Sequence, residues 1–302
     1  MVAGAGRAGT TGVVEGLRSH PRVFVTQPKE PHYFALHGQN VAYTGPGDDA
    51  TINRVAVTHR ADYLALYPRE HDYLALGDGS VSTLYYAERS VAEICRINPR
   101  MKVIVLLRDP VDRAYSSFLY MRARGFEPYG DFLEAVADET KRAAEGWHHL
   151  WHYTAMSRYA DSLGVLIETL GEDQIGVWFY DDLTSDYVGT VRRMLRFLEL
   201  PPVPGEATGI PRVNVSGTPR VRSAQRLISW ATKNERIRAT VKRRTSFLWR
   251  EHVRRSLLNP SSPAQTQRAQ LQPMFADDLA RLRQLLPEHR LPTWLAGEPG
   301  GS

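Results

Sequence analysis

A glycine-rich loop near the start of the chain lies between a short apolar run and a helical pattern, and it constrains the fold more than any other feature. The apolar run covers residues 1–5, and the loop reads Gly4-Ala-Gly-Arg-Ala-Gly-Thr-Thr11. Glycines let the backbone approach a ligand closely, and the first amides of the following helix point toward an anion. A strand, a glycine turn and a helix in this order are typical of phosphate-binding α/β proteins.

The loop fits two phosphate-binding patterns. Its three glycines match G-x-G-x-x-G, the pattern of dinucleotide-binding domains, and the first and last also match the outer glycines of a P-loop. Thr10 and Thr11 stand where a P-loop NTPase has Lys and Ser or Thr, which disfavours nucleoside triphosphate hydrolysis. A dinucleotide site expects an acidic residue about 20 positions further on, and Glu30 falls near that place. A Rossmann-type oxidoreductase that binds NAD(P) or FAD therefore stays an alternative.

Short apolar runs alternate with helical patterns along the first 200 residues. The runs that predict strands are residues 1–5, 22–26, 72–77, 102–107 and 175–180. The helical patterns cover residues 11–19, 84–97, 111–122, 151–170, 187–198 and, near the end of the chain, 265–286, while residues 37–68 form an irregular insert. This alternation predicts an α/β fold, a P-loop-like three-layer architecture with a central parallel five-stranded sheet.

The distribution of charge divides the chain into two parts. The 302 residues carry a formal charge of +5, but residues 220–256 hold twelve Lys or Arg and two Glu, a net charge of +10. A Pro- and Gly-rich stretch at 201–219 precedes this basic segment. We therefore expect an α/β core over residues 1–219 and a basic helical C-terminal extension over 220–302, packed on or covering the active site.

The cysteine content and hydropathy indicate the compartment. Cys95 is the only cysteine, which excludes an intramolecular disulfide and suits a reducing compartment. The sequence contains no apolar run of about 18 residues, and its first residues lack the pattern of a signal peptide. These features predict a cytoplasmic protein.

Chemistry-bearing residues follow the second and fourth predicted strands. Lys29, Glu30 and His32 come directly after the second strand, and a carboxylate next to a cation and an imidazole is a candidate acid–base cluster or, equally, a solvated turn. Arg108 leaves the fourth strand, and Ser116 lies two helical turns further on. The guanidinium of an arginine can bind a phosphate through two hydrogen bonds, and a serine hydroxyl can add a third, so Arg108 and Ser116 form a candidate second anion site. The alternative is an Arg–Asp pair on the surface with a buried serine.

Three histidines lie among aromatic residues at 147–153. His148 and His152 have the i, i+4 spacing of a metal pair on a helix, but no third ligand is evident, so we expect no metal site. The aromatic side chains around them either belong to the core or line a pocket for an acceptor ring.

Taken together, these segments resemble the PAPS-dependent sulfotransferases, in particular the carbohydrate and heparan-type branch and its bacterial relatives. Four motifs in order carry the resemblance: Arg7-Ala-Gly-Thr-Thr11, Lys29-Glu-Pro-His-Tyr-Phe34, Arg108-Asp-Pro-Val-Asp-Arg-Ala-Tyr-Ser-Ser117 and Phe179-Tyr-Asp-Asp-Leu183. The resemblance covers about residues 1–200. It implies transfer of a sulfuryl group from 3′-phosphoadenosine 5′-phosphosulfate (PAPS) to a hydroxyl of a glycan, glycolipid or small natural product, with 3′-phosphoadenosine 5′-phosphate (PAP) as the second product.

The resemblance also implies roles for single residues. Glu30 takes the acceptor's proton, His32 supports it, and Lys29 and Arg7 stabilise charge on the moving group and its leaving oxygen. The residues implied in binding PAPS are Arg7, Ala8, Gly9, Thr10, Thr11, Arg108, Ser116 and, more weakly, Arg220 or Arg222. Because cations and amide dipoles suffice for this reaction, no metal is expected.

The chain departs from the family pattern in two places. Arg7 stands where the family often has lysine, and Gly79 stands where a lysine often follows the third strand. Because this lysine contacts the sulfuryl group or the acceptor in the family pattern, its absence affects the expected class of acceptor more than the expected donor.

The basic segment allows three interpretations. It can bind an anionic or lipid-bearing acceptor through cations such as Lys242, Arg243, Arg244, Arg254 and Arg255. It can instead bind nucleic acid, a competing non-enzyme function, or be a solvated helix pair. With the sulfotransferase interpretation, no nucleic-acid partner is expected.

Overall fold

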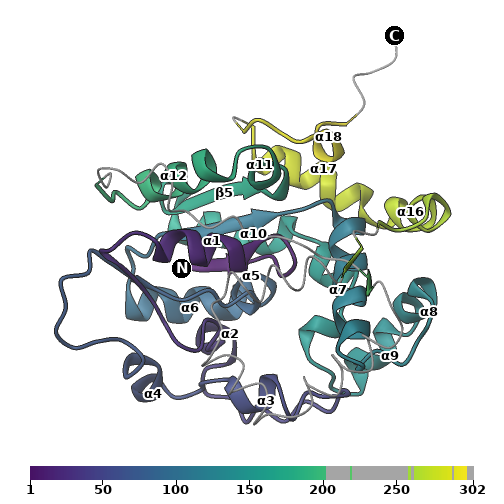
Figure 1. The fold of residues 1–302 in the computed structure, drawn as a ribbon, viewed down its shortest axis with the longest axis horizontal. Helices are drawn as coiled ribbons and strands as arrows, with labels where there is room; N and C mark the ends of the chain where they lie inside the picture. The colour runs from purple at the N-terminus through teal and green to yellow at the C-terminus, as the bar shows by residue number, and fades with distance from the viewer. Residues whose placement is uncertain (202–217, 220–257, 260–261, 288, 298–302) are drawn as a thin grey trace.

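The computed structural model describes residues 1–201, 218–219, 258–259, 262–287 and 289–297, and it has an α/β architecture (Figure 1). Its strands are β1 Val2–Gly4, β2 Val23–Val25, β3 Ala75–Gly77, β4 Val103–Leu107 and β5 Ile175–Phe179, with a two-residue pair, β6 Thr218–Pro219 and β7 Leu258–Asn259. The α-helices are α1 Thr10–Arg18, α2 Tyr33–Leu36, α3 Ile52–Val55, α4 Arg60–Leu64, α5 Ser82–Tyr85, α6 Ala87–Ile97, α7 Pro110–Ala123, α8 Phe132–Ala137, α9 Glu139–Ala144, α10 Ala160–Leu170, α11 Tyr180–Ser185, α12 Tyr187–Phe197, α16 Gln265–Leu271, α17 Ala276–Leu285 and α18 Thr293–Ala296.

The five predicted strands are present, but the predicted five-stranded sheet is not. Hydrogen bonds join β1, β4 and β5 into one parallel sheet in the order β1-β4-β5, and they join β2 and β3 into a second parallel sheet. The backbone N–H of Val2 donates to the carbonyl of Asp78, 2.9 Å away, which lies just after the last residue of β3. Because β1 begins where β3 ends, the two strands barely overlap and form no ladder.

Strand β4 lies at the centre of the core. All five of its residues are buried, as the apolar run predicted, and β4 pairs in register with β5 from Val103 opposite Ile175 to Leu107 opposite Phe179. Parallel strands covered on both faces need apolar side chains at every position, which explains this run.

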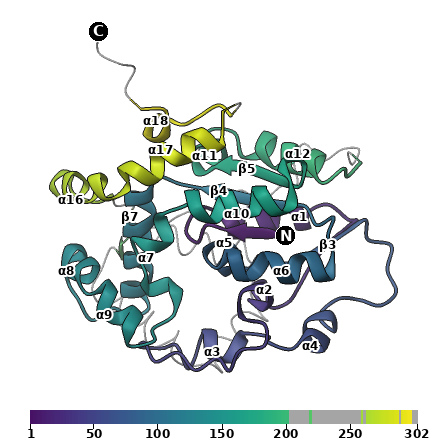
Figure 2. The same ribbon diagram turned by 180° about the vertical axis from the view of Figure 1, so that it is seen from behind.

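Helices cover both faces of the sheets (Figure 1 and Figure 2). Helices α1 and α12 pack together on one face, where the Tyr187 hydroxyl donates to the carbonyl of Gly12, 2.6 Å away. Helices α6 and α10 pack together on the other. The three-layer arrangement of the prediction is therefore present in the described residues.

Two predicted helices are shorter than expected. The pattern at 151–170 begins at the last residue of one 3₁₀ turn, His149–Trp151, and contains a second, Ala155–Ser157, before α10 begins at Ala160. The Asp278 carboxylate accepts the backbone N–H groups of Tyr159 (2.9 Å) and Ala160 (3.1 Å), and this distant partner fixes the start of α10. The pattern at 265–286 divides into α16, a 3₁₀ turn and α17, since Pro273 lacks the N–H that an unbroken α-helix needs.

The C-terminal helices pack on the core. Buried Leu282 and Leu295 belong to the same apolar cluster as β4. Trp294 of α18 donates its indole N–H to Asp181, 3.1 Å away, and its ring lies near Phe179. Within the described part of the chain, no helix is both long and apolar enough to cross a membrane.

Candidate functional site

The glycine loop connects β1 to α1 at the carboxyl edge of the central sheet. Gly9 caps α1 with φ 94°, a left-handed conformation that favours glycine, and Arg7 has φ 72°. The Ala5 N–H donates to the carbonyl of Leu106, 2.6 Å away, so the loop is tied to the end of β4. The first amides of a helix have no partner inside it, and those of Thr10 and Thr11 open α1 as the sequence predicted.

One predicted amide donor is engaged within the loop. The Ala8 N–H donates to the carbonyl of Ala5 at 3.2 Å and closes a turn. Thr10 is buried and Thr11 is exposed, so the two hydroxyls lie in different surroundings.

The predicted anion-binding residues of two distant segments lie together. The Arg7 Nε donates to the hydroxyl oxygen of Ser116, 3.3 Å away, and the Arg108 Nη1 donates to the carbonyl of Arg7, 3.0 Å away. The guanidinium of Arg108 stacks 4.4 Å from the ring centre of Tyr180, and that of Arg7 lies 4.7 Å from the ring centre of Tyr120. The aromatic rings fix the positions of both guanidinium groups, so two cations lie close together at the carboxyl edge of the central sheet.

A buried arginine, Arg113, connects the backbone of the glycine loop to the residues that precede α10. It donates from Nε to the Ser157 hydroxyl (2.6 Å), from Nη2 to the Tyr153 carbonyl (2.7 Å) and from Nη1 to the Gly6 carbonyl (3.3 Å). Arg113 therefore links the glycine loop to the turn before α10. Arg113 falls inside the third motif, but its spacing in the sequence predicted no role for it.

The Lys29-Glu30 pair lies against the start of α1. The Lys29 Nζ lies 2.6 Å from Glu30 Oε1 and 3.5 Å from the Thr10 hydroxyl oxygen. Burial raises the pKa of Glu30, but the charge of Lys29 and hydrogen bonds from Lys29 and the Val81 backbone oppose burial, and the pKa lies below its ordinary value. Glu30 is thus ionised at neutral pH and able to accept a proton.

Contacts with Ser80 and Ser82 fix the orientation of His32, two residues after Glu30. Its Nδ1 lies 2.8 Å from the Ser82 hydroxyl oxygen, and its backbone N–H donates to the Ser80 hydroxyl oxygen, 3.0 Å away. Burial lowers the pKa of His32, and Lys29 lowers it further, against the opposing effect of Glu30. His32 is therefore neutral at physiological pH.

The histidines at 148–152 lie close to His32 but have separate partners. The His148 Nε2 lies 3.3 Å from a carboxylate oxygen of Asp48, while the His152 Nδ1 lies 2.9 Å from the Tyr85 hydroxyl. Among the described residues, no group of three or more His, Cys, Asp or Glu side chains is arranged to hold a metal ion.

Unlike His148 and His152, His149 has no hydrogen-bond partner for its ring among the described residues. It is fully buried, its ring centre lies 5.7 Å from that of His32, and within the part of the chain described here neither ring nitrogen has a hydrogen-bond partner. Trp151 and Tyr153 are buried too, so these two aromatic residues belong to the core.

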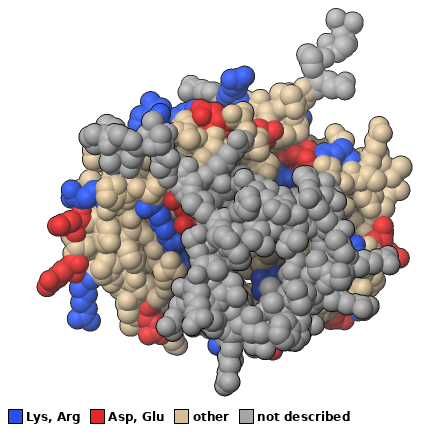
Figure 3. Space-filling model, viewed as in Figure 1, with Lys and Arg blue, Asp and Glu red and all other residues tan. Residues whose placement is uncertain are grey.

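Some predicted residues lie outside the described ranges. These are Arg220, Arg222, Lys242, Arg243, Arg244, Arg254 and Arg255. On the face shown in Figure 3, charged side chains of both signs are scattered over the described surface. On that face, the described residues therefore form no large patch of a single charge.

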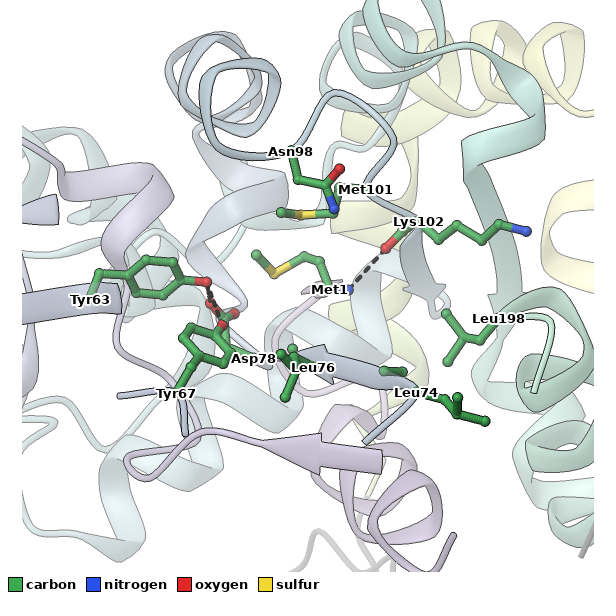
Figure 4. A pocket seen from close by; sticks show the side chains of 12 residues that line it. Met1, Tyr63, Tyr67, Leu74, Leu76, Asp78, Asn98, Met101, Lys102 and Leu198 are labelled. Carbon is green, nitrogen blue, oxygen red and sulfur yellow. Dashed lines mark hydrogen bonds between the residues drawn. The ribbon is translucent and has the colours of Figure 1, made fainter. Parts of the chain in front are cut away.

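A cavity of about 230 Å³ lies elsewhere, beside strand β3 and the amino-terminal ends of β1 and β4 (Figure 4). Its lining includes Tyr63, Asp78 and Lys102, and the Tyr63 hydroxyl donates to the Asp78 carboxylate, 2.8 Å away. The glycine loop lies at the opposite edge of the sheet, so this cavity is separate from the candidate site.

Comparison with known proteins decides the family. The model of the sulfotransferase family matches residues 1–204, two thirds of the chain. The chain belongs to the sulfotransferase family. This confirms the resemblance found from the four motifs and disfavours the dinucleotide-binding alternative.

Individual relatives agree with the family assignment. Carbohydrate sulfotransferase 15 of Mus musculus is 28% identical over 171 residues, which is 45% of this chain and 29% of the relative, and that of Homo sapiens is 26% identical over the same shares. The matches thus span less than a third of these curated relatives. The crystal structure of a sulfotransferase from Alicyclobacillus acidocaldarius shares the fold, with a TM-score of 0.73, 23% identity and coverage of 97% of this chain and 96% of that one.

Proposed function

We propose that this sulfotransferase moves the sulfuryl group of PAPS to an acceptor hydroxyl, giving a sulfate ester and PAP. The contact of Lys29 with both Glu30 and Thr10 carries the proposal, because it joins a carboxylate base to the anion-binding loop. A base next to the loop is the arrangement that an in-line transfer needs, with the attacking and leaving oxygens on opposite sides of the sulfur.

The residues at the carboxyl edge fit a donor with two separated phosphates. In this proposal the Thr10 and Thr11 amides and hydroxyls, with Arg7, hold the 5′-phosphosulfate, while Arg108 and Ser116 hold the 3′-phosphate. The Arg7–Ser116 contact of 3.3 Å supports this proposal, because it brings the glycine loop and helix α7 to one common site. When bound, PAPS supplies the sulfuryl group, and its 5′-phosphate departs with the electron pair of the broken S–O bond.

Glu30 acts as the general base in this proposal. Its carboxylate takes the proton of the acceptor hydroxyl as the oxygen–sulfur bond forms. Lys29 stabilises the negative charge that moves toward the leaving phosphate, and neutral His32, held by Ser82, fixes the surroundings of the base.

We propose a glycan, glycolipid or small natural-product hydroxyl as the acceptor. The curated relatives are carbohydrate sulfotransferases, which supports a sugar acceptor. The half-buried rings of Tyr85 and Tyr86 lie 6.1 and 5.6 Å from the ring of His149, next to His32, and offer apolar faces on the side of the base. The boundary at residue 219, a role for the basic segment 220–256 in binding the acceptor and action in the cytoplasm stay predictions.

The proposal is tested with Glu30→Gln. The variant keeps the size of the side chain but removes the base, so we expect transfer of ³⁵S from labelled PAPS to a panel of glycans and phenols to fall by about 10²- to 10⁴-fold. PAP affinity should change little. Glu15→Gln is the matched control, because Glu15 pairs with Arg18 at 2.7 Å on α1 and has no proposed role in the reaction. Full turnover in Glu30→Gln would remove Glu30 as the base, and a wild-type protein that does not bind PAP would overturn the proposed function itself.

A further inference from the structure

A C-terminal arginine reaches the second anion-binding segment. Arg268 of α16 contacts two carboxylates at the start of α7: its Nη1 lies 2.9 Å from Asp109 Oδ2, and its Nη2 pairs with Asp112. These partners are 159 and 156 residues away in the sequence. In both Figure 1 and Figure 2, α16 lies close to one end of α7.

The two carboxylates lie beside Arg108. Asp109 follows Arg108 directly and caps α7, where its Oδ1 accepts the Asp112 N–H at 2.8 Å. Burial raises the pKa of Asp112, and the negative charge of Asp109 adds to this, whereas Arg268 and Arg108 lower it. Asp112 is therefore close enough to feel the charge of the arginine that is proposed to bind the 3′-phosphate.

A second contact joins the same C-terminal region to Arg108. The Tyr159 hydroxyl donates to the Arg108 carbonyl, 2.9 Å away, and the Tyr159 N–H donates to Asp278 of α17, 2.9 Å away. The C-terminal helices thus hold the Arg108 backbone through Tyr159 and the adjacent carboxylates through Arg268.

The charges of this cluster explain why the contact matters. Two carboxylates next to Arg108 attract its guanidinium and repel an incoming phosphate dianion. Arg268 offers a planar fork that neutralises both carboxylates at once. All three side chains are partly buried, with exposed fractions of 32% for Arg268, 15% for Asp109 and 30% for Asp112, so solvent screens the pairs only in part.

We propose that Arg268 is a positioning residue of the nucleotide site, which neutralises Asp109 and Asp112 so that Arg108 can bind the 3′-phosphate of PAP and PAPS. The inference rests on the proposed function, since it takes Arg108 as the 3′-phosphate ligand. It makes the C-terminal helices part of the donor site, although they lie beyond the matched residues 1–204.

The test compares PAP with adenosine 5′-monophosphate, which lacks the 3′-phosphate, by calorimetry on the full chain. Arg268→Ala should bind PAP about tenfold more weakly, which corresponds to about 1.4 kcal/mol, and should bind adenosine 5′-monophosphate nearly as well as the wild type. Arg268→Lys should recover part of the loss. The control is Arg193→Ala, which removes an ion pair with Asp186 at 3.6 Å that takes no part in the contacts of Arg108 described above.

Removing a negative charge separates electrostatics from packing. Adding Asp112→Asn to Arg268→Ala should restore most of the PAP affinity, and Asp112→Asn alone should bind PAP at least as tightly as the wild type. The inference is overturned if Arg268→Ala and Arg193→Ala behave alike, or if Asp112→Asn restores nothing. Failure of the wild-type protein to bind PAP would instead overturn the proposed function, and this inference with it.

Discussion

Gly79 leaves open the space that the side chain of Lys29 occupies. A β-carbon at position 79 would lie 2.8 Å from Lys29 Cε and 2.8 Å from Val14 Cγ2, and the Gly79 N–H donates to the Lys29 carbonyl, 2.9 Å away. The glycine at this position therefore lets Lys29 reach Glu30 and Thr10.

Gly79→Ala should lower both turnover and stability. The added methyl displaces Lys29, which moves the ammonium away from Glu30, and it also presses on Val14, which is buried in the core. We expect kcat to fall by about tenfold, the equivalent of one charge-assisted contact, and the melting temperature to fall by several degrees, because overpacking a core costs about 1–3 kcal/mol. Gly130→Ala is the control, since no atom lies within 4 Å of a β-carbon there. Equal kcat values for the two variants would contradict this role of Gly79.

Arg108→Ala should impair binding of the 3′-phosphate selectively. A hydrogen bond to a charged group contributes about 1.5–3 kcal/mol, so we expect PAP affinity to fall by about 10- to 100-fold. Affinity for adenosine 5′-monophosphate should fall much less, because that ligand lacks the 3′-phosphate. Isothermal titration calorimetry with both nucleotides checks this prediction, and equal losses for both would refute the assignment of Arg108.

The buried histidines should make stability depend on pH. Burial lowers the pKa of all four histidines. The pKa of His148 falls to about 3, the pKa of His149 lies well below its ordinary value, and the pKa values of His32 and His152 are also lowered. Between about pH 6.5 and these lowered values the unfolded chain binds protons that the folded chain does not, so stability falls as pH falls. Each histidine contributes up to about 1.4 kcal/mol per pH unit within that window.

Urea unfolding at intervals from pH 7.5 to pH 5.5 measures this slope. His149→Phe should reduce this slope, because the unfolded variant binds up to one proton fewer than the unfolded wild type. A stability that is flat over this range, or that rises toward pH 5.5, would contradict the prediction.

Much of the fold was predictable because local sequence dictates it. The apolar run at Val103–Leu107 became the buried central strand, and the glycine loop became a turn that opens α1. The grouping of Arg7, Arg108 and Ser116 followed from one rule, since the carboxyl ends of parallel strands share an edge.

Other features depend on contacts between distant segments that local patterns do not encode. The start of α10 is set by Asp278, more than 100 residues later, and the separation into two sheets follows from the offset of Val2 against Asp78. The burial of His149 and the pairing of Arg268 with Asp109 likewise arise only when the helices pack.

Thermal unfolding of the wild-type protein with PAP, NAD⁺, ATP or buffer alone tests the central claim most directly. A ligand present at 100 times its Kd adds about 2.7 kcal/mol to the free energy of unfolding, which raises the melting temperature by several degrees. We predict such a rise with PAP and little or none with NAD⁺ or ATP. A rise with NAD⁺ but not with PAP, or no rise with any of the three, would contradict the account.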